Sequence, residues 1–123
     1  MIPDGEWRPI AAYVDGQVLP VHELRVAELS MHDGRYQILD GSRSLLDEGC
    51  YDLGDDAKLR PIDLRIDKGP HAGRRLRGIF ACEQDLLTIC YDLDGGERPT
   101  SFEPREELLL LQITYARVLR GVH

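Results

Sequence analysis

Tyrosine, glutamate and aspartate side chains give this chain the chemistry that a binding or catalytic pocket needs. The 123 residues include five tyrosines, and Tyr36, Glu48, Tyr51 and Asp63 stand in short stretches where apolar residues recur at every second position. A phenol or carboxyl group in apolar surroundings can transfer one proton, which is sufficient to isomerise or cyclise a confined substrate. These four residues are the candidate catalytic residues.

The motifs of better-defined catalytic classes are missing from the sequence. It contains no Gly-x-Ser-x-Gly elbow, no phosphate-cradling glycine loop and no dinucleotide fingerprint. The four histidines form no His-x-His or His-x-x-x-His pair, so we predict neither a metal nor a cofactor. Three cysteines without metal-type spacing are expected to be free thiols in a reducing cytoplasm.

Short alternating stretches separated by turn residues predict an all-β domain. Turn residues interrupt the apolar runs every 8 to 12 positions, as in a sandwich or barrel, and Asp-Gly and Gly-Pro pairs are among them. We expect one domain over residues 1–123, an eight-stranded antiparallel up-and-down barrel. The predicted strands are 6–14, 27–32, 35–40, 46–53, 60–67, 74–83, 85–92 and 107–118.

Two segments depart from this alternation. Pro20 can open a helix, and Val21, Leu24 and Ala27 would share one face of it, so residues 19–28 predict a short helical lid after the first strand. Residues 104–120 carry both helix-capping signals and β-branched residues. We favour a strand there, because an antiparallel sheet must pair its edges.

A set of motifs in this order resembles an uncharacterised bacterial family of lipocalin-like domains. The similarity covers residues 5–118, and the family as such has no assigned activity. The motifs are Gly5-x-Trp7, Val14-Asp15-Gly16, Gly49-x-Tyr51, Pro61-Ile62-Asp63-Leu64, Gly78-Ile79-Phe80, Leu86 to Cys90 and Glu97-Arg98-Pro99-Thr100-x-Phe102.

The resemblance implies a small calycin-type barrel with one end closed by a tryptophan. In such barrels the glycine of Gly-x-Trp precedes an indole that lies across the closed end, under an arginine of the last strand. Gly5 and Trp7 match the first two positions, and Arg117 matches the arginine, with Arg120 as the alternative. We therefore expect structural roles for Gly5, Trp7 and Arg117.

Alternation along the strands predicts which side chains line the interior. If Trp7 points inward, a pocket of aliphatic groups and phenols results, suited to a small apolar molecule with one or two polar groups. The alternative is that the same rings fill the barrel completely. The ligand-binding candidates from the strands are Tyr13, Met31, Tyr36, Tyr51, Leu64, Phe80 and Tyr115.

Arginine and lysine residues suggest two further sites. Arg98, in the Glu-Arg-Pro-Thr turn, can clamp a ligand carboxylate at the barrel mouth or can tie the loop to backbone carbonyls. Seven of the 15 basic residues fall between Lys58 and Arg77. We expect them to form a solvated hairpin face with Asp63 and Asp67 as cross-strand partners, although such a patch can also attract an anion.

Composition restricts the possible partners. A formal charge of −7 repels nucleic acid and anionic membranes, and the sequence contains neither a secretory signal nor an apolar run long enough for a membrane helix. We expect a cytoplasmic monomer or homodimer that binds a small apolar or amphipathic molecule. The alternatives are a cofactor-free cyclase or isomerase of a biosynthetic pathway, and a filled barrel acting as a protein-interaction module.

Overall fold

The computed structural model describes residues 3–54, 60–93, 98–102 and 109–118 of the protein. Within these ranges it contains nine strands and one short 3₁₀ helix. They are β1 (Gly5–Val14), β2 (Gln17–Val18), η1 (Val21–Leu24), β3 (Glu28–His32), β4 (Arg35–Leu39), β5 (Leu45–Leu53), β6 (Arg60–Lys68), β7 (Arg75–Glu83), β8 (Leu86–Asp92) and β9 (Leu110–Arg117).

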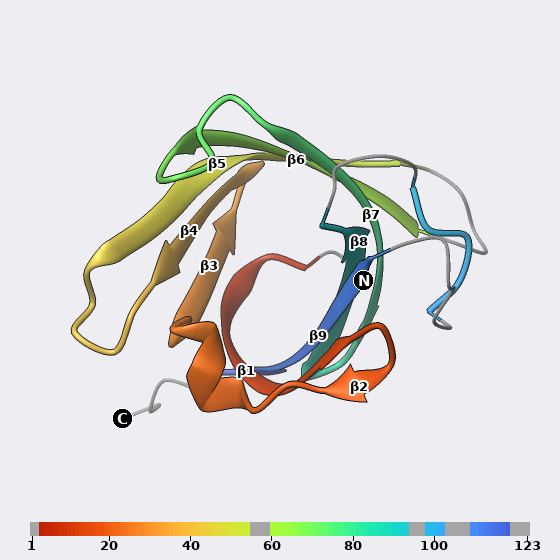
Figure 1. Ribbon diagram of the computed structural model, residues 1–123. Coiled ribbons are helices and arrows are strands. Elements are labelled where there is room, and N and C mark those ends of the chain that lie inside the picture. The colour runs from red at the N-terminus through yellow and green to blue at the C-terminus, as the bar shows by residue number, and fades with distance from the viewer. Residues whose placement is uncertain (1–2, 55–59, 94–97, 103–108, 119–123) are drawn as a thin grey trace.

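Eight of the strands close into an antiparallel barrel (Figure 1). Each strand from β3 to β9 pairs with its neighbour in the chain, and β1 pairs with both β3 and β9. The two-residue β2 lies outside this ring and pairs only with the end of β1. The predicted all-β fold and the closed eight-stranded barrel are therefore confirmed, with β2 as an addition.

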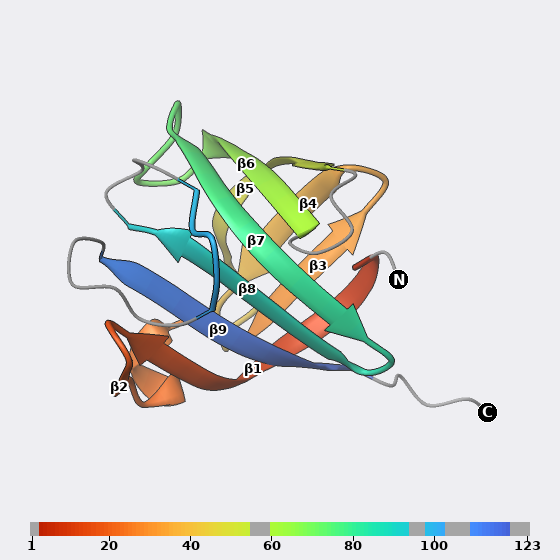
Figure 2. The same ribbon diagram turned by 90° about the vertical axis from the view of Figure 1, so that its right-hand side faces the viewer.

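The last described segment is a strand. β9 pairs along its length with β8 on one side and with β1 on the other, so that β7, β8, β9 and β1 lie side by side (Figure 2). A helix at 110–117 would leave the edges of β1 and β8 unpaired, which explains why the strand signals prevail. Residues 103–108, the first part of the ambiguous segment, lie outside the described residues.

The expected helical lid over residues 19–28 is wrong. The segment forms only the single 3₁₀ turn η1, without a side-chain hydrogen bond at its cap. Arg25 follows in the left-handed conformation at φ 63°, which stops the turn, and the Ala27 amide already donates a hydrogen bond to the Leu39 carbonyl of the sheet. Strand pairing therefore begins before a helix can extend.

The barrel interior holds the main hydrophobic core. Inward-facing side chains come from all eight barrel strands, and on β8 they are Leu87, Ile89 and Tyr91, a choice that the sequence leaves open. A smaller cluster of Ile79, Cys90 and Leu110 lies apart from this core.

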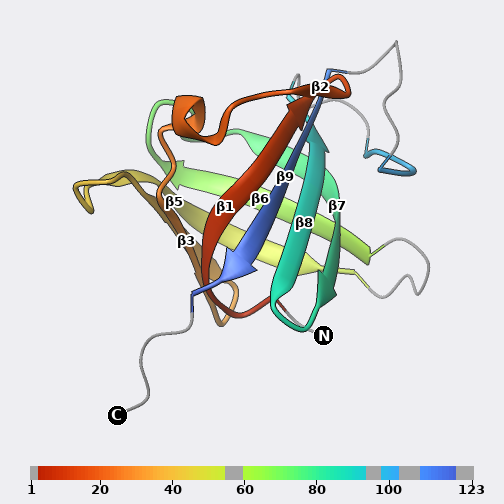
Figure 3. The same cartoon turned by 90° about the horizontal axis from the view of Figure 1, so that it is seen from below.

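The two ends of the barrel are built differently. β2 and η1 lie at one end, while the start of β1 and the end of β9 lie at the other (Figure 3). We call the end that carries the start of β1 the closed end, and the end that carries η1 the open end.

Candidate functional site

The indole of Trp7 plugs the closed end. Trp7 is fully buried, and its Nε1 donates a hydrogen bond of 2.9 Å to the carbonyl of Pro3. The guanidinium carbon of Arg117 lies 4.3 Å from the centre of the ring. Such a stack contributes about 0.5–2 kcal/mol beyond the burial of the ring. The predicted arginine over tryptophan is present and is Arg117, whereas Arg120 lies outside the described residues.

Arg117 also joins three segments at the closed end. Its Nη1 donates to the Asp4 carbonyl at 3.0 Å, its Nη2 to the Gln84 carbonyl at 3.2 Å, and its Nε lies 3.3 Å from Asp85 Oδ1. Gly5 makes room for this arrangement, because its φ is +135° and a Cβ there would lie 2.5 Å from Arg117 Nη1. A glycine is therefore required two residues before the tryptophan.

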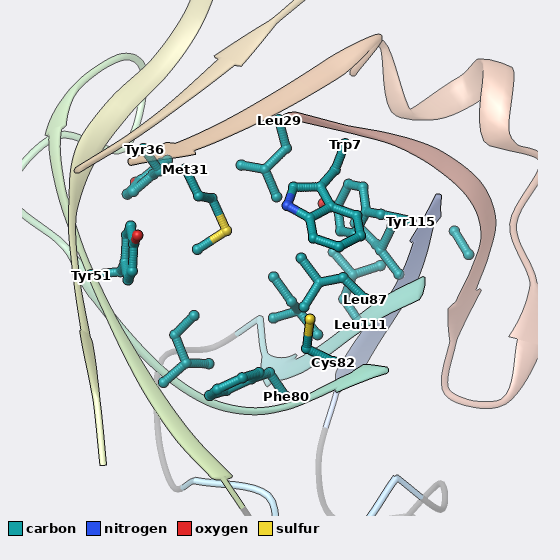
Figure 4. Packing of buried hydrophobic residues seen from close by; sticks show 14 residues of the cluster. Trp7, Leu29, Met31, Tyr36, Tyr51, Phe80, Cys82, Leu87, Leu111 and Tyr115 are labelled. Carbon is teal, nitrogen blue, oxygen red and sulfur yellow. The ribbon is translucent and has the colours of Figure 1, made fainter. Parts of the chain in front are cut away.

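Six of the eight predicted ligand-binding residues pack in the barrel interior. Their side chains belong to the cluster that Figure 4 shows, or pack against it, and all except Leu64 are buried. These residues are Met31, Tyr36, Tyr51, Leu64, Phe80 and Tyr115.

The expectation that Tyr13 faces the interior is wrong. Tyr13 is 36% exposed, whereas its neighbour Ala12 is buried. The pairing of β1 with β9 shifts between Pro9 and Ala11, and this irregularity moves every later side chain of β1 to the opposite face. Tyr13 instead borders a hollow of about 330 Å³ that Cys90 and Phe102 also line.

Arg98 ties its loop to the sheet. Its Nη1 donates to the Gly78 carbonyl at 2.9 Å and to the Ile62 carbonyl at 3.4 Å, and its Nη2 lies 2.7 Å from Asp63 Oδ1. These contacts match the second of the two alternatives for this residue. The fold itself therefore engages the guanidinium, and the carboxylate clamp stays a prediction.

Glu48 and Asp63 face away from the interior. On β5 the inward positions belong to Gly49 and Tyr51, so Glu48 points outward, 3.5 Å from Arg35 and 3.6 Å from Lys68. A hydrogen bond from Gln37 and these two cations lower the pKa of Glu48. Asp63 is exposed and pairs with Arg98. Neither carboxylate belongs to an interior site.

The basic residues Arg65, Lys68, Arg75 and Arg77 lie on the exposed face of β6 and β7, as expected, whereas Arg60 lies over the interior Phe80 ring, 4.7 Å from its centre. The expected cross-strand partners do not pair within the described part of this hairpin, because Asp63 contacts Arg98. Arg65 lies 3.4 Å from Asp67 on the same strand, and Asp67 also pairs with Arg35 of β4. Lys58, the first residue of the predicted stretch, lies outside the described residues.

A cavity of about 610 Å³ lies at the open end of the barrel. Its volume falls in the usual range of small-molecule sites, about 300–1,000 Å³. Its rim comes from residues 24–26 after η1, residues 45–46 of β5 and residues 69–71 between β6 and β7. Its wall, among the described residues, consists of Ile38, Asp47, Tyr91, Leu111, Ile113 and Tyr115.

Asp47 is a cavity-lining carboxylate that the sequence analysis missed. It pairs with Ile38 of β4, and its Oδ1 is buried without a hydrogen-bond partner among the described residues. Burial raises the pKa of Asp47 above its ordinary value, and the nearby His71 opposes this effect. The alternation pattern could have found it, because Asp47 stands four residues before Tyr51 and therefore in phase with this predicted interior residue.

Gly69 makes room for this carboxylate. Its φ is +116°, and a Cβ at this position would collide with Asp47 Oδ1 and with the Leu46 carbonyl. The turn after β6 therefore covers one oxygen of Asp47 with backbone and offers it no donor.

Burial keeps the interior phenols protonated. It raises the pKa of Tyr91 to about 12, with Asp47 as a further cause, and that of Tyr51 to about 12, with a hydrogen bond to Asp4 as a further cause. Burial also raises the pKa values of Tyr36 and Tyr115 well above the ordinary value. At neutral pH these rings are uncharged.

The open-end cavity contains few of the predicted site residues. Tyr36, Glu48, Tyr51 and Asp63 do not line it, and the Tyr51 hydroxyl is engaged with Asp4 at the closed end. Of the ligand-binding candidates, Tyr115 does line it. Sequence reasoning found the interior wall and the interior phenols, but it assigned the outward-facing Glu48 and Asp63 to the site and missed Asp47.

Known proteins supply no direct guide to this site. No protein-family model matches the chain, and the comparisons with curated proteins and with solved structures found no match either. In the described part of the chain, no three His, Cys, Asp or Glu side chains are grouped to hold a metal, and no helix has the length and apolar character to cross a membrane.

Proposed function

We propose that this protein is a cytoplasmic, lipocalin-like barrel that binds a small apolar or amphipathic molecule without a cofactor. The observation that carries the proposal is the open-end cavity, a hollow of about 610 Å³ whose wall is aliphatic and aromatic except for Asp47. This volume favours a ligand site over a filled barrel that acts as an interaction module.

The cavity wall is suited to an alkyl chain or a small ring system. Ile38, Leu111 and Ile113 present aliphatic surface, and each methylene transferred from water to such a surface contributes about 0.8 kcal/mol. Trp7 closes the opposite end of the barrel, so a ligand enters and leaves through the open end.

Binding of neutral alkanols tests the proposal. Added 1-octanol, 1-decanol and 1-dodecanol should each displace a polarity-sensitive, uncharged dye from the wild-type protein. The affinity for the alkanol should increase along this series. Ile38→Trp places a large side chain in the cavity and should weaken decanol binding by about tenfold or more.

The matched control is Gln37→Trp, the same change at the neighbouring exposed position of β4. It should leave decanol affinity within about twofold of wild type, because it lies on the outer face. Circular dichroism verifies that both variants fold, and Leu111→Phe serves as a second cavity variant. Absence of saturable binding, or equal binding by the cavity and control variants, would refute the proposal.

We propose as a second candidate that the barrel is a cofactor-free isomerase or cyclase that uses Asp47 as its acid and base. A carboxyl group in an apolar wall, with its pKa raised by burial, is the specific observation that favours this activity. The test is hydrogen–deuterium exchange at the α-carbon of 2-decanone in D₂O, followed by NMR. Exchange that is faster than in buffer alone and is lost in Asp47→Asn would support this activity. Exchange at the same rate as in buffer alone would contradict it.

A further inference from the structure

The carboxylate of Asp47 lacks the partner that such a group normally has. Its Oδ1 is buried without a hydrogen bond, and none of the ion pairs found among the described residues involves it. A buried carboxylate is stable when a cation or several donors compensate for the lost water. The Gly69 turn covers Oδ1, and no hydrogen bond or ion pair from the described residues reaches the other carboxylate oxygen, so that oxygen can accept a hydrogen bond from a ligand.

The surroundings of Asp47 favour a cation over an anion. Asp47 is the one acidic residue among the described residues that line the cavity, and the whole chain carries a net charge of −7. The basic residues of the cavity are Arg25 and His71, both on the rim and both exposed, so water screens their charges. On the described wall itself, beyond this rim, the carboxylate is therefore the charged group that an ammonium contacts.

Aromatic rings complete this environment. Tyr91 and Tyr115 line the same cavity, and the phenol of Tyr91 interacts electrostatically with Asp47. Both phenols are uncharged at neutral pH, and the face of an uncharged ring attracts an ammonium or its first methylene groups. A carboxylate beside aromatic rings in an aliphatic wall matches a cationic head with an apolar body.

We infer that the ligand of the open-end cavity is an amphipathic amine, bound with its protonated nitrogen at Asp47 and its apolar part along β8 and β9. This inference rests on the proposed function, since it assigns the chemical class of the molecule that the barrel binds. The bond is a charge-assisted hydrogen bond from the ammonium to the carboxylate, about twice as strong as a neutral one.

Isothermal titration of wild-type protein with decylamine, 1-decanol and decanoate, at pH 7.5 and low salt, tests the inference. The three probes share a ten-carbon chain and differ in the head group. We expect decylamine to bind about tenfold more tightly than decanol, and decanoate to bind more weakly than decanol. Added salt should reduce the preference for the amine.

Asp47→Asn should reduce the preference for decylamine over decanol to about twofold or less while decanol affinity stays unchanged. Glu48→Gln is the matched control, because it removes a neighbouring carboxylate on the outer face and should keep the preference. If Asp47→Asn does not fold, Asp47→Ser replaces it.

Equal binding of decylamine and decanol by wild type, tighter binding of decanoate, or a preference that persists without Asp47 would overturn the inference and leave the proposed function standing. Binding of none of the three probes would overturn both.

Discussion

The closed end and the open end of this barrel use polar groups in opposite ways. At the closed end the Trp7 indole and the Arg117 guanidinium have their donors satisfied by backbone carbonyls of the same chain. At the open end Asp47 has a buried oxygen without a donor, beside a cavity of about 610 Å³. The closed end contributes stability, whereas the open end carries the cavity and the unpartnered carboxylate on which the proposed function rests.

This difference teaches where function can reside in a small barrel. Buried polar groups that the fold itself satisfies hold the sheet closed and leave nothing for a ligand. A buried group that the fold leaves unsatisfied costs stability, and such a cost is typical of sites that act on another molecule. The two ends should therefore respond to mutation with opposite signs.

Trp7→Ala should produce the largest loss of stability. It removes a fully buried indole together with the Arg117 stack, and we expect the free energy of unfolding to fall by about 3–5 kcal/mol. Urea denaturation followed by circular dichroism measures it. Val18→Ala, at a position that is 75% exposed, should change stability by less than about 0.5 kcal/mol. Similar losses for both would contradict a plugged closed end.

Gly5→Ala should be the next most damaging change. A side chain at φ +135° is strained, and its Cβ would displace Arg117 Nη1, so we expect a loss of about 1–3 kcal/mol. Gly41→Ala is the control, because nothing lies within 4 Å of a Cβ there and its φ is not positive. Thermal unfolding of the two variants compares them. A Gly5→Ala melting temperature equal to that of wild type would show that the glycine is dispensable.

Arg117→Lys separates the contribution of the planar guanidinium from that of the positive charge. Lysine keeps the cation but loses the planar stack and the fork that reaches Asp4 and Gln84, so we expect a loss of about 1 kcal/mol. Arg77→Lys, on the exposed face of β7, should have almost no effect on the urea midpoint. An equal shift of the urea midpoint in both variants would show that the loss comes from replacing any arginine by lysine and not from the contacts of Arg117.

Asp47→Asn should have the smallest effect and the opposite sign. The folded-state pKa of Asp47 is raised above 3.8, so the folded protein binds this proton more tightly than the unfolded chain. Wild-type stability should therefore fall as pH rises from about 4 through the folded-state pKa, and then level off. The asparagine variant lacks this decline, and after allowance for solvent screening we expect it to be more stable than wild type by about 0.5 kcal/mol at pH 8.

Glu48→Gln provides the contrast for this pH series. The folded-state pKa of Glu48 is lowered, so its contribution to stability is present at neutral pH and is lost as pH falls through that pKa. The variant should be less stable than wild type at pH 7 and similar to it in acid. Urea denaturation at pH 4 to 8 measures the free energy of unfolding of both variants. If the two variants differed from wild type in the same way at every pH, the opposite pKa shifts of Asp47 and Glu48 would be contradicted.

Much of the fold could be predicted because it depends on local signals. Period-two alternation and the Asp-Gly turns locate the eight barrel strands, and the same alternation assigns Met31, Tyr36 and Phe80 to the interior. Resemblance to a family led to Trp7 and Arg117, which do stack. Membership of that family stays a prediction, since the comparisons found no match.

The site could be predicted only in part, because the positions of several of its residues depend on pairing between segments that are far apart in the chain. The register shift in β1 exposes Tyr13, and no local signal in the sequence marks it. Arg98 lies against the carbonyls of Ile62 and Gly78, residues that are distant in the chain. Asp47 was within reach of the alternation argument, but its lack of a partner depends on how the turn at Gly69 covers it.

The sequence by itself determined that the chain forms an antiparallel β-sheet and which side chains of most strands face one way, because neighbouring residues on a pleated strand point to opposite sides. Tertiary structure alone decided where β1 changes face, how Arg98 is anchored and which carboxylate is left without a donor among the described residues. These features depend on contacts between residues far apart in the chain, and the geometry of such contacts exists only once the barrel has closed.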